Sequence, residues 1–440
     1  MSFKKRFTSA RIIILGFAGV ILLGALLLML PISSQKHVVT PFLDCLFTST
    51  SAVCVTGLIV HDTATYWTSF GQFIILLLIQ IGGMGVVTIA CALAILSGRK
   101  IGILQRATMQ DSIGAFQMGG IMRMVKFIIK GVLLLEGLGA VSMAFVFIPK
   151  FGLGKGIWYA IFHSISAFCN AGFDLMGVIK PYSSIMTMRS NPIINWTIML
   201  LIIIGGLGFF VWNNILVHKW HFKKYSLHAK VVLTTTVLLL VIPSVYFFFG
   251  EFQNVHDFQT RFFLSAFQSV TARTAGFNSV DFNTMTQTGA MVMTLLMLIG
   301  GSPGSTAGGM KTTTFAVMLA NVTAIFHRDN VHMFHRRIDN DTVRSAATIF
   351  TMYITLCVGV AMIISRIEGI PMMACLFEAA SAIGTVGCTM GITPHLCAVS
   401  HILLILLMYF GRVGGLTLAY AVASKSRFVK SMPEERISVG

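Results

Sequence analysis

Eight long apolar runs constrain the fold of this chain more than any other feature of its sequence. One bilayer crossing takes about 20 apolar residues, and the chain is 55% hydrophobic and only 11% charged. Soluble domains carry roughly 25% charged residues, so an ordinary water-soluble enzyme is excluded. We expect an all-α polytopic membrane protein with these spanning candidates: Arg11 to Leu30, Gln72 to Leu96, Val125 to Ile148, Pro192 to Val217, Val231 to Phe249, Gly289 to Ile325, Ala346 to Ile364 and His401 to Ala423.

A shorter, semi-polar apolar stretch lies inside each successive pair of runs. With at most 14 residues these stretches are too short to span a bilayer, and we interpret them as re-entrant pore half-helices: Pro41 to Val53, Ile157 to Cys169, Phe258 to Thr271 and Pro371 to Ile383. Helix, half-helix and helix thus repeat four times, which predicts pseudo-four-fold symmetry around one pore. We expect the pore units at residues 1–98, 99–218, 219–327 (with a broken second helix) and 328–440 (with a short cytoplasmic tail).

The distribution of basic residues predicts the sidedness. If both termini share a side, that side carries 22 of the 32 Lys and Arg residues and 6 of the 15 acidic residues. By the positive-inside rule this side, and both termini with it, is cytoplasmic. Topology then accounts for most of the net charge of +17, and no nucleic-acid partner is needed. A cleaved signal peptide is a weaker alternative, because no small-residue cleavage site follows the first run.

Each half-helix ends in a related heptad that closes on glycine. The heptads are Ser51-Ala-Val-Cys-Val-Thr-Gly57, Ser166-Ala-Phe-Cys-Asn-Ala-Gly172, Val270-Thr-Ala-Arg-Thr-Ala-Gly276 and Ser381-Ala-Ile-Gly-Thr-Val-Gly387. Their glycines are 115, 104 and 111 residues apart. Non-helical backbone at membrane depth is tolerated where it is buried in protein or lines a watery cavity. A ring of carbonyls that replaces the hydration shell of a cation would meet that condition, whereas close packing of membrane helices is the alternative role for such glycines.

The fourth heptad ends in Thr385-Val-Gly387, the start of the Thr-Val-Gly-Tyr-Gly filter of potassium channels. With Leu30-Pro-Ile-Ser33, Gln80-Ile-Gly-Gly-Met-Gly85, Asn170-Ala-Gly-Phe173 and Thr274-Ala-Gly-Phe-Asn278, it makes the whole chain resemble the membrane subunit of Ktr-type bacterial potassium transporters, in the Trk/Ktr/HKT superfamily. The resemblance implies potassium uptake across the bacterial cell membrane, often sodium-dependent, by a homodimer with one pore per subunit. It also implies a separate cytoplasmic nucleotide-binding ring, like KtrA or KtrC, as regulatory partner.

The resemblance places the ion filter in the last three residues of each heptad. Potassium would bind the backbone of the four glycines, and the filter positions are Val55, Thr56, Gly57, Asn170, Ala171, Gly172, Thr274, Ala275, Gly276, Thr385, Val386 and Gly387. Three of the four loops depart from the potassium-channel filter. Unequal loops do not readily form the stacked carbonyl rings of a channel with identical subunits. We therefore expect one well-formed ion site near the glycines and looser discrimination between potassium and sodium.

The sixth apolar run contains a glycine-rich interruption. Five glycines and one proline within ten residues cannot sustain a helix, so the run must break in mid-membrane. The resemblance identifies this strip as the gate of the pore, and a kinked helix that packs tightly is the alternative. The gate residues are Gly300, Gly301, Ser302, Pro303, Gly304, Ser305, Thr306, Ala307, Gly308, Gly309 and Lys311, together with Arg412 from the eighth run.

The same strip imitates a phosphate-binding loop, but its lysine is displaced by one position from the Walker pattern and no strand precedes it. We expect no nucleotide in this chain.

Four charged residues of the predicted membrane region are candidates for a functional role. Such charges tend to mark function. We expect Arg412 to act as an electrostatic barrier to cations, with a structural partner for freed carbonyls as the alternative. Arg273 would brace the third loop from behind and Lys311 would anchor the gate, while Glu136 is open between a helix-packing hydrogen bond and a counter-ion role.

Other candidate sites are weak. The pairs His218/His221 and His332/His335 have metal-compatible spacing, but they lie in basic connections where a solvated or headgroup-facing surface is favoured. Four aspartates flank the pore segments on the outer side, either as a cation-concentrating ring or as ordinary loop charges: Asp62, Asp174, Asp257 and Asp281.

Two rival functions compete with a gated pore. An ion-coupled alternating-access symporter would favour inverted repeats and membrane acids, and these repeats are parallel with few acids. A membrane-embedded enzyme would need clustered Asp, Glu or His at the interface, and the sequence has no convincing cluster. We therefore predict potassium translocation, with K⁺ and possibly Na⁺ as the ions, and no enzyme activity.

Overall fold

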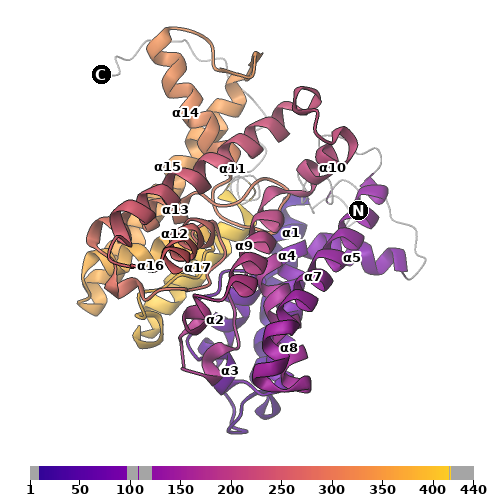
Figure 1. Cartoon of the computed structure of the whole chain (residues 1–440), viewed down its shortest axis with the longest axis vertical. Coiled ribbons are helices and arrows are strands. Elements are labelled where there is room, and N and C mark those ends of the chain that lie inside the picture. Colours follow the sequence, from indigo (N-terminus) through magenta and orange to yellow (C-terminus); the bar gives the residue numbers. More distant parts are fainter. Residues whose placement is uncertain (1–8, 97–107, 109–120, 416, 418–440) are drawn as a thin grey trace, which may run out of the picture.

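The computed structural model describes residues 9–96, 108, 121–415 and 417, and nearly all of them lie in helices and the turns between helices (Figure 1). The small exception is a two-stranded antiparallel hairpin, β1 (His332–Met333) and β2 (Arg336–Arg337). The predicted all-α class is confirmed. Several predicted features lie outside the described residues: the basic start Lys4 to Arg6, the unit boundary at 98/99, most of the Arg99 to Lys130 connection and the tail from Lys425.

Among the described residues, four helices are long and apolar enough to cross a membrane without a break. They are α1 (Ser9–Leu28), α7 (Ile121–Phe151), α11 (Leu227–Tyr246), which the π-helical turn Phe247–Glu251 continues, and α15 (Asn340–Glu368). They correspond to the first, third, fifth and seventh apolar runs. Polar caps fix two of their starts: the side chains of Ser226 and Asp339 accept hydrogen bonds from the second or third N–H groups of α11 and α15.

A short helix follows each of these long ones at the position of a predicted half-helix. These helices are α2 (Phe42–Val53), α8 (Leu153–Phe168), α12 (Phe258–Thr271) and α16 (Met372–Gly384). Their C-terminal halves are buried, although these halves are rich in small and polar residues. A polar sequence that is buried needs partners within the protein, and each of these helices packs on the helices before and after it.

All four second helices of the units are broken, where we expected a break only in the sixth run. A single glycine separates α4 (Ser69–Met84) from α5 (Val86–Leu96), and another separates α9 (Pro192–Leu207) from α10 (Phe209–His218) at a bend of 94°. The glycine-rich strip separates α13 (Gln287–Leu298) from α14 (Thr312–His327), and α17 (Ala398–Val413) ends at Gly414. The second, fourth and eighth runs are therefore not the continuous spans that their hydropathy suggested.

The helices pack in a closed cycle. Beyond the contacts within each unit, α4 packs on α8, α9 on α12, α13 on α16, and α17 returns to α2. Each of these second helices thus touches the half-helix of the following unit, and the last one touches the half-helix of the first unit. The connections α10–α11 and α14–α15 lie at one end of the molecule, at the top of Figure 1, and the short helix α3 (Thr63–Tyr66) lies at the opposite end.

Candidate functional site

The four heptad glycines meet in a ring. A Cβ atom built on Gly57 would lie 2.6 Å from the carbonyl oxygen of Ala171, and one on Gly172 would lie 2.7 Å from that of Ala275. A Cβ atom on Gly276 would lie 2.3 Å from the carbonyl oxygen of Val386, and one on Gly387 would lie 2.1 Å from that of Thr56. Each glycine therefore faces the residue before the next glycine, and any side chain there would strike a carbonyl of the neighbouring loop.

All four loops share one backbone conformation. The glycines have φ between +69° and +96°, and the residue two positions before each glycine also has positive φ, between +51° and +64°. These residues are Val55, Asn170, Thr274 and Thr385. Positive φ in a β-branched residue is a strained outlier that persists where its surroundings impose it. The shared pattern of positive φ shows that the four loops follow a similar backbone path.

Hydroxyl groups at the ends of the half-helices hold the loops in two ways. The Oγ atoms of Ser51 and Ser381 accept the N–H groups of Gly57 and Gly387, at 3.0 and 2.9 Å. In the other two loops, Ser166 Oγ donates to the Phe173 carbonyl (2.6 Å) and Thr271 Oγ1 donates to the Phe277 carbonyl (2.8 Å). The third heptad begins with valine, so Thr271, one residue later, provides the hydroxyl that serine provides elsewhere.

The glycine-rich strip lies against the half-helices of the second and fourth units. Thr306 Oγ1 donates to the Phe168 carbonyl (3.0 Å) and lies 3.2 Å from Asn170 Oδ1. A Cβ atom on Gly308 would lie 2.2 Å from Thr385 Oγ1. A parallel bridge between Ile299 and Met310 closes the base of the strip. The strip therefore contacts residues at the start of two ring loops.

Two partly buried basic side chains, Lys311 and Arg412, hold the strip in place. Arg412 donates to the carbonyls of Thr306, Gly82 and Gly83, the last at 3.1 Å. Gly82 and Gly83 belong to the last turn of α4, where carbonyls lack helical partners. Lys311 Nζ donates to the Ala307 carbonyl (2.8 Å) and lies 3.4 Å from that of Gly308. These contacts are those of the structural alternative for Arg412, and the barrier role stays a prediction.

A cavity of about 160 Å³ adjoins the strip. Gly83, Gly85, Ser305, Lys311 and Arg412 are among the residues that line it. Both cationic side chains thus border space that the ring loops do not fill.

A repeated Gly-x-x-Gly motif explains the helix breaks, and we did not predict its role. It occurs as Gly82-x-x-Gly85, Gly205-x-x-Gly208 and Gly411-x-x-Gly414. The second glycine of each motif ends its helix with φ of 85–93° and ψ of 133–141°, which an L-residue rarely adopts. A Cβ on the first glycine would lie 2.0–2.1 Å from the carbonyl four residues before a ring glycine. The motif is visible in the sequence, where its first glycine follows the heptad glycine by 25, 33 and 24 residues.

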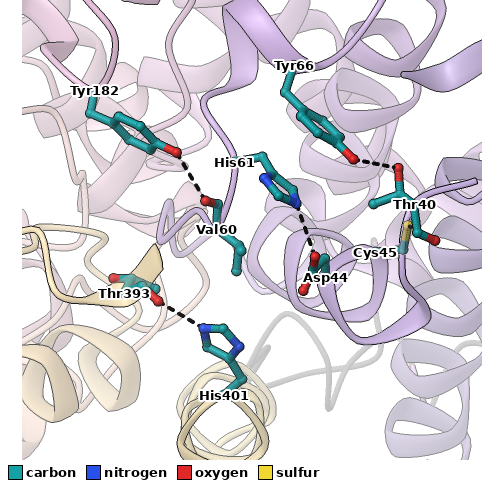
Figure 2. Close-up of polar contacts among 9 residues, drawn as sticks. All are labelled: Thr40, Asp44, Cys45, Val60, His61, Tyr66, Tyr182, Thr393 and His401. Atoms are coloured by element: carbon teal, nitrogen blue, oxygen red, sulfur yellow. Dashed lines mark hydrogen bonds and ion pairs between the residues drawn. The ribbon is translucent and has the colours of Figure 1, made fainter. Parts of the chain in front are cut away.

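The outer ends of the loops are tied to one another. The Tyr182 hydroxyl donates to the Val60 carbonyl (3.2 Å), and Asn278 N–H donates to Ser184 Oγ (3.1 Å). Figure 2 shows the Tyr182 contact beside His61, whose ring lies 3.1 Å from Asp44. These ties join the segments after Gly57, Gly172 and Gly276 on the outer side of the ring.

Three of the four outer aspartates cap helices. Asp62, Asp257 and Asp281 accept backbone N–H groups at the starts of α3, α12 and the 3₁₀ turn Phe282–Thr284. Asp174 is different, because it lies half-buried two residues after Gly172. Burial, and secondarily the nearby Asp62 carboxylate, raises the pKa of Asp174 to about 7. The four aspartates therefore do not act alike, and Asp174 combines a place beside the ring with a raised pKa.

The remaining residues that the sequence singled out lie in different surroundings. Gln80 Nε2 donates to the Glu136 carboxylate (3.3 Å), so Glu136 makes a hydrogen bond between helices α4 and α7. Arg273 is 5% exposed, and its Nε has no hydrogen-bond partner among the described residues. All eight cysteines are free, and the described residues contain no group of three or more His, Cys, Asp or Glu residues that could hold a metal ion. The pairs His218/His221 and His332/His335 are mostly exposed at the surface.

Comparison with known proteins agrees with this architecture. The family model TrkH, described as a cation transport protein, matches residues 8–432. The potassium/sodium uptake protein NtpJ of Enterococcus hirae is 40% identical over 99% of this chain and 98% of its own length. The Ktr system potassium uptake protein B of Bacillus subtilis is 37% identical over 99% of this chain and 97% of its own.

A solved structure supports the fold independently. The potassium transporter TrkH from Vibrio parahaemolyticus aligns with a TM-score of 0.73 at 20% identity, over 96% of this chain and 86% of that one. The relatives are named as transport proteins and not as enzymes. This chain is a multi-pass membrane protein that belongs to the TrkH family of cation transport proteins.

Proposed function

We propose that the protein takes up potassium through a single filter made by the backbone of four non-identical loops. The observation that carries this proposal is the closed ring of glycine contacts, in which four segments more than 100 residues apart share one conformation. The filter residues are those of the four loop ends from Val55 to Gly57, Asn170 to Gly172, Thr274 to Gly276 and Thr385 to Gly387. A ring of carbonyls replaces the water around a dehydrated monovalent cation.

The four half-helices add an electrostatic contribution. Each ends one to three residues before its positive-φ loop residue. Its C-terminus, with a partial negative charge of about half an elementary charge, would therefore point at the ring. Four such ends favour a cation over an anion at the centre. The same proposal includes pseudo-four-fold symmetry, in which the four pore units repeat around an axis through the centre of the ring.

We propose that the strip from Gly300 to Gly309 gates the path beneath the filter. Its contacts with Phe168, Asn170 and Thr385 put it against the inner side of the loops, and its glycines allow movement at low steric cost. Arg412 and Lys311 would hold the closed state by their hydrogen bonds to the strip. The positive charge of Arg412 would at the same time oppose the passage of cations.

Sodium dependence, assembly and regulation complete the proposal. One relative is named a potassium/sodium uptake protein, and others are named as components of Ktr systems. We propose that Na⁺ stimulates or accompanies K⁺ uptake, that the protein is a homodimer in the bacterial cell membrane, and that its termini face the cytoplasm. A separate nucleotide-binding ring would dock on the basic cytoplasmic face.

Flux measurements in proteoliposomes test the function. Purified protein should catalyse uptake of ⁸⁶Rb⁺ or K⁺ down a gradient, more strongly with sodium present, and Gly57→Ser, Gly172→Ser, Gly276→Ser and Gly387→Ser should each change the K⁺:Na⁺ ratio. Single-pore currents would identify a channel-like path, whereas turnover that stays tightly coupled to a second ion would identify an alternating-access symporter. Protein-loaded vesicles with no more cation flux than empty ones would contradict the proposal.

A further inference from the structure

Glu378 is a buried carboxylate that the proposed pore mechanism does not use. It lies on half-helix α16 with no exposed surface. Its Oε1 accepts the hydroxyls of Thr389 (3.0 Å) and Thr393, which belong to the segment after Gly387. Its Oε2 has no partner among the described residues, where no salt bridge reaches it either. Burying a carboxyl group costs free energy unless its hydrogen bonds compensate. The partners of Glu378 should therefore indicate what the buried carboxyl does.

Two other half-helices carry a polar side chain that makes the corresponding contact. His163 on α8 accepts the Leu175 N–H at its Nε2 (3.3 Å), while its Nδ1 lies 2.7 Å from the Tyr159 carbonyl. Gln268 on α12 donates to Ser279 Oγ (2.8 Å). Both side chains are completely buried. In each case the contact ties a rigid helix to the segment just outside a ring glycine.

The positions of these three residues match. Glu378 precedes Ser381 by three residues, His163 precedes Ser166 by three, and Gln268 precedes Thr271 by three. Ser381, Ser166 and Thr271 are the hydroxyl residues that hold the loops. In the third loop, both the hydroxyl residue and the polar residue before it are thus one position nearer to the ring glycine than in the other two loops. This shared displacement indicates that the three contacts are one repeated structural feature.

The first loop lacks this brace. Thr48 occupies the matching position, and its buried hydroxyl has no partner in the described part of the chain. The Tyr182 hydroxyl holds Val60 from a neighbouring unit instead (Figure 2). On the fourth loop, His401 Nε2 donates to the Thr393 carbonyl (2.9 Å), so Thr393 is held from α16 and α17 together.

We propose that Glu378, His163 and Gln268 are positioning residues of the filter, and that Glu378 sets the ion discrimination of the fourth loop by hydrogen-bonding its outer segment. This inference rests on the proposed function. Thr389 lies two residues after Gly387, so a shift of this segment would displace the Gly387 carbonyl. Because one carboxyl oxygen accepts both hydroxyls, the segment cannot shift without breaking two hydrogen bonds to α16.

The test compares an apolar with an isosteric substitution in proteoliposomes. Glu378→Leu should lower the K⁺:Na⁺ uptake ratio by about tenfold, because it removes both hydrogen bonds. Glu378→Gln keeps an acceptor oxygen of the same shape and should restore most of the ratio. Glu368→Leu is the matched control: Glu368 is a half-buried outer carboxylate at the end of α15 that binds Cys397 N–H and Ser400, and its loss should leave the ratio unchanged.

Three results would overturn the inference. They are a wild-type ratio in Glu378→Leu, an equal loss in Glu378→Gln, which would assign the effect to charge, and an equal loss in Glu368→Leu. If Glu378→Leu yields no folded protein by size-exclusion chromatography, the double variant Thr389→Val/Thr393→Val decides by the same ratio: a lowered ratio supports the brace and an unchanged one refutes it. Failure of the proposed function is distinct, because the wild-type protein itself would then transport no potassium.

Discussion

The first and fourth ring loops differ from the second and third in how their glycines are held. In the first pair a serine hydroxyl accepts the glycine N–H, and the glycine φ values are 96° and 95°. In the second pair the hydroxyl donates instead to the carbonyl of the phenylalanine after the glycine, and the φ values are 69° and 77°. Because contacts run from loop one to four and back to one, the like loops are neighbours.

The ring therefore has two halves and not four equal quarters. Each pair reaches a similar backbone path through a different hydrogen bond. The glycine-rich strip contacts one loop of each pair, the second through Thr306 and the fourth through Gly308. If the ring filters potassium, the two halves should not tolerate the same substitutions.

The largest difference is expected for glycine replacement. At φ +95° Gly387 lies outside the left-handed region near +57°, and an added Cβ would lie 2.1 Å from a carbonyl; Gly172 is at +69° and 2.7 Å. A strained φ costs about 1–3 kcal/mol, and each 1.4 kcal/mol is about tenfold. Gly387→Ser should lower the K⁺:Na⁺ uptake ratio by roughly tenfold or more, and Gly172→Ser clearly less. Equal losses in a competition uptake assay would show that the halves are equivalent.

Next in size is the effect of releasing the strip that spans the two halves. Arg412→Ala removes hydrogen bonds to Thr306, Gly82 and Gly83 together with one positive charge, and should raise potassium flux by about fivefold. Arg412→Lys keeps the charge but cannot reach three carbonyls with a planar fork. Flux near the wild-type value in the lysine variant supports the barrier, and flux near the alanine value supports the tether. Loss of folded protein without raised flux would support a purely structural role.

A smaller effect is expected from the hydroxyls that define the halves. Ser381→Ala strands the buried Gly387 N–H, at a cost of about 1–3 kcal/mol, whereas Thr271→Val leaves a carbonyl, which is less often fully paired in proteins. Ser381→Ala should therefore lower the K⁺:Na⁺ ratio by about threefold, with a smaller change for Thr271→Val. The Tm measured in detergent should likewise fall more in Ser381→Ala than in Thr271→Val. A larger fall in Thr271→Val would contradict this order of effects.

The smallest effect is expected from external pH, through the second loop. Because the pKa of Asp174 is raised to about 7, its carboxyl is neutral below that pH and negative above it. The corresponding positions in the other loops are Ile59, Asn278 and Thr389, which do not titrate. Uptake at low potassium should rise about twofold between about pH 6 and pH 8 as the charge appears. Asp174→Asn should flatten that rise, and an unchanged pH profile in the variant would exclude Asp174 as its source.

Much of the architecture was predictable because bilayer insertion leaves a strong imprint on the sequence. The four continuous helices and four half-helices lie within a few residues of the predicted stretches. The breaks at Gly85, Gly208 and Gly414 were missed, since a hydropathy window counts a glycine as an ordinary member of an apolar run. Only the repeated Gly-x-x-Gly motif distinguishes these breaks from a continuous span.

The candidate site was predictable by residue type but not by contact. The repeated heptads pointed to the four loops, and the resemblance pointed to the strip and Arg412. The two classes of loop were hidden, because Ser51 and Ser166 stand at the same heptad position and yet one accepts from the glycine and the other donates to a carbonyl. A hydroxyl group can donate or accept, so its heptad position does not decide between the two hydrogen bonds.

By itself, the sequence determined the membrane setting, the order of long and short helices and the four places where glycine closes a loop, because hydropathy and steric freedom are properties of local chain segments. The tertiary structure alone decided that these loops close into a ring with two unlike halves, and that Glu378, His163 and Gln268 brace it. Such contacts join residues far apart in the chain, and their partners are set only when all four units have packed around the same centre.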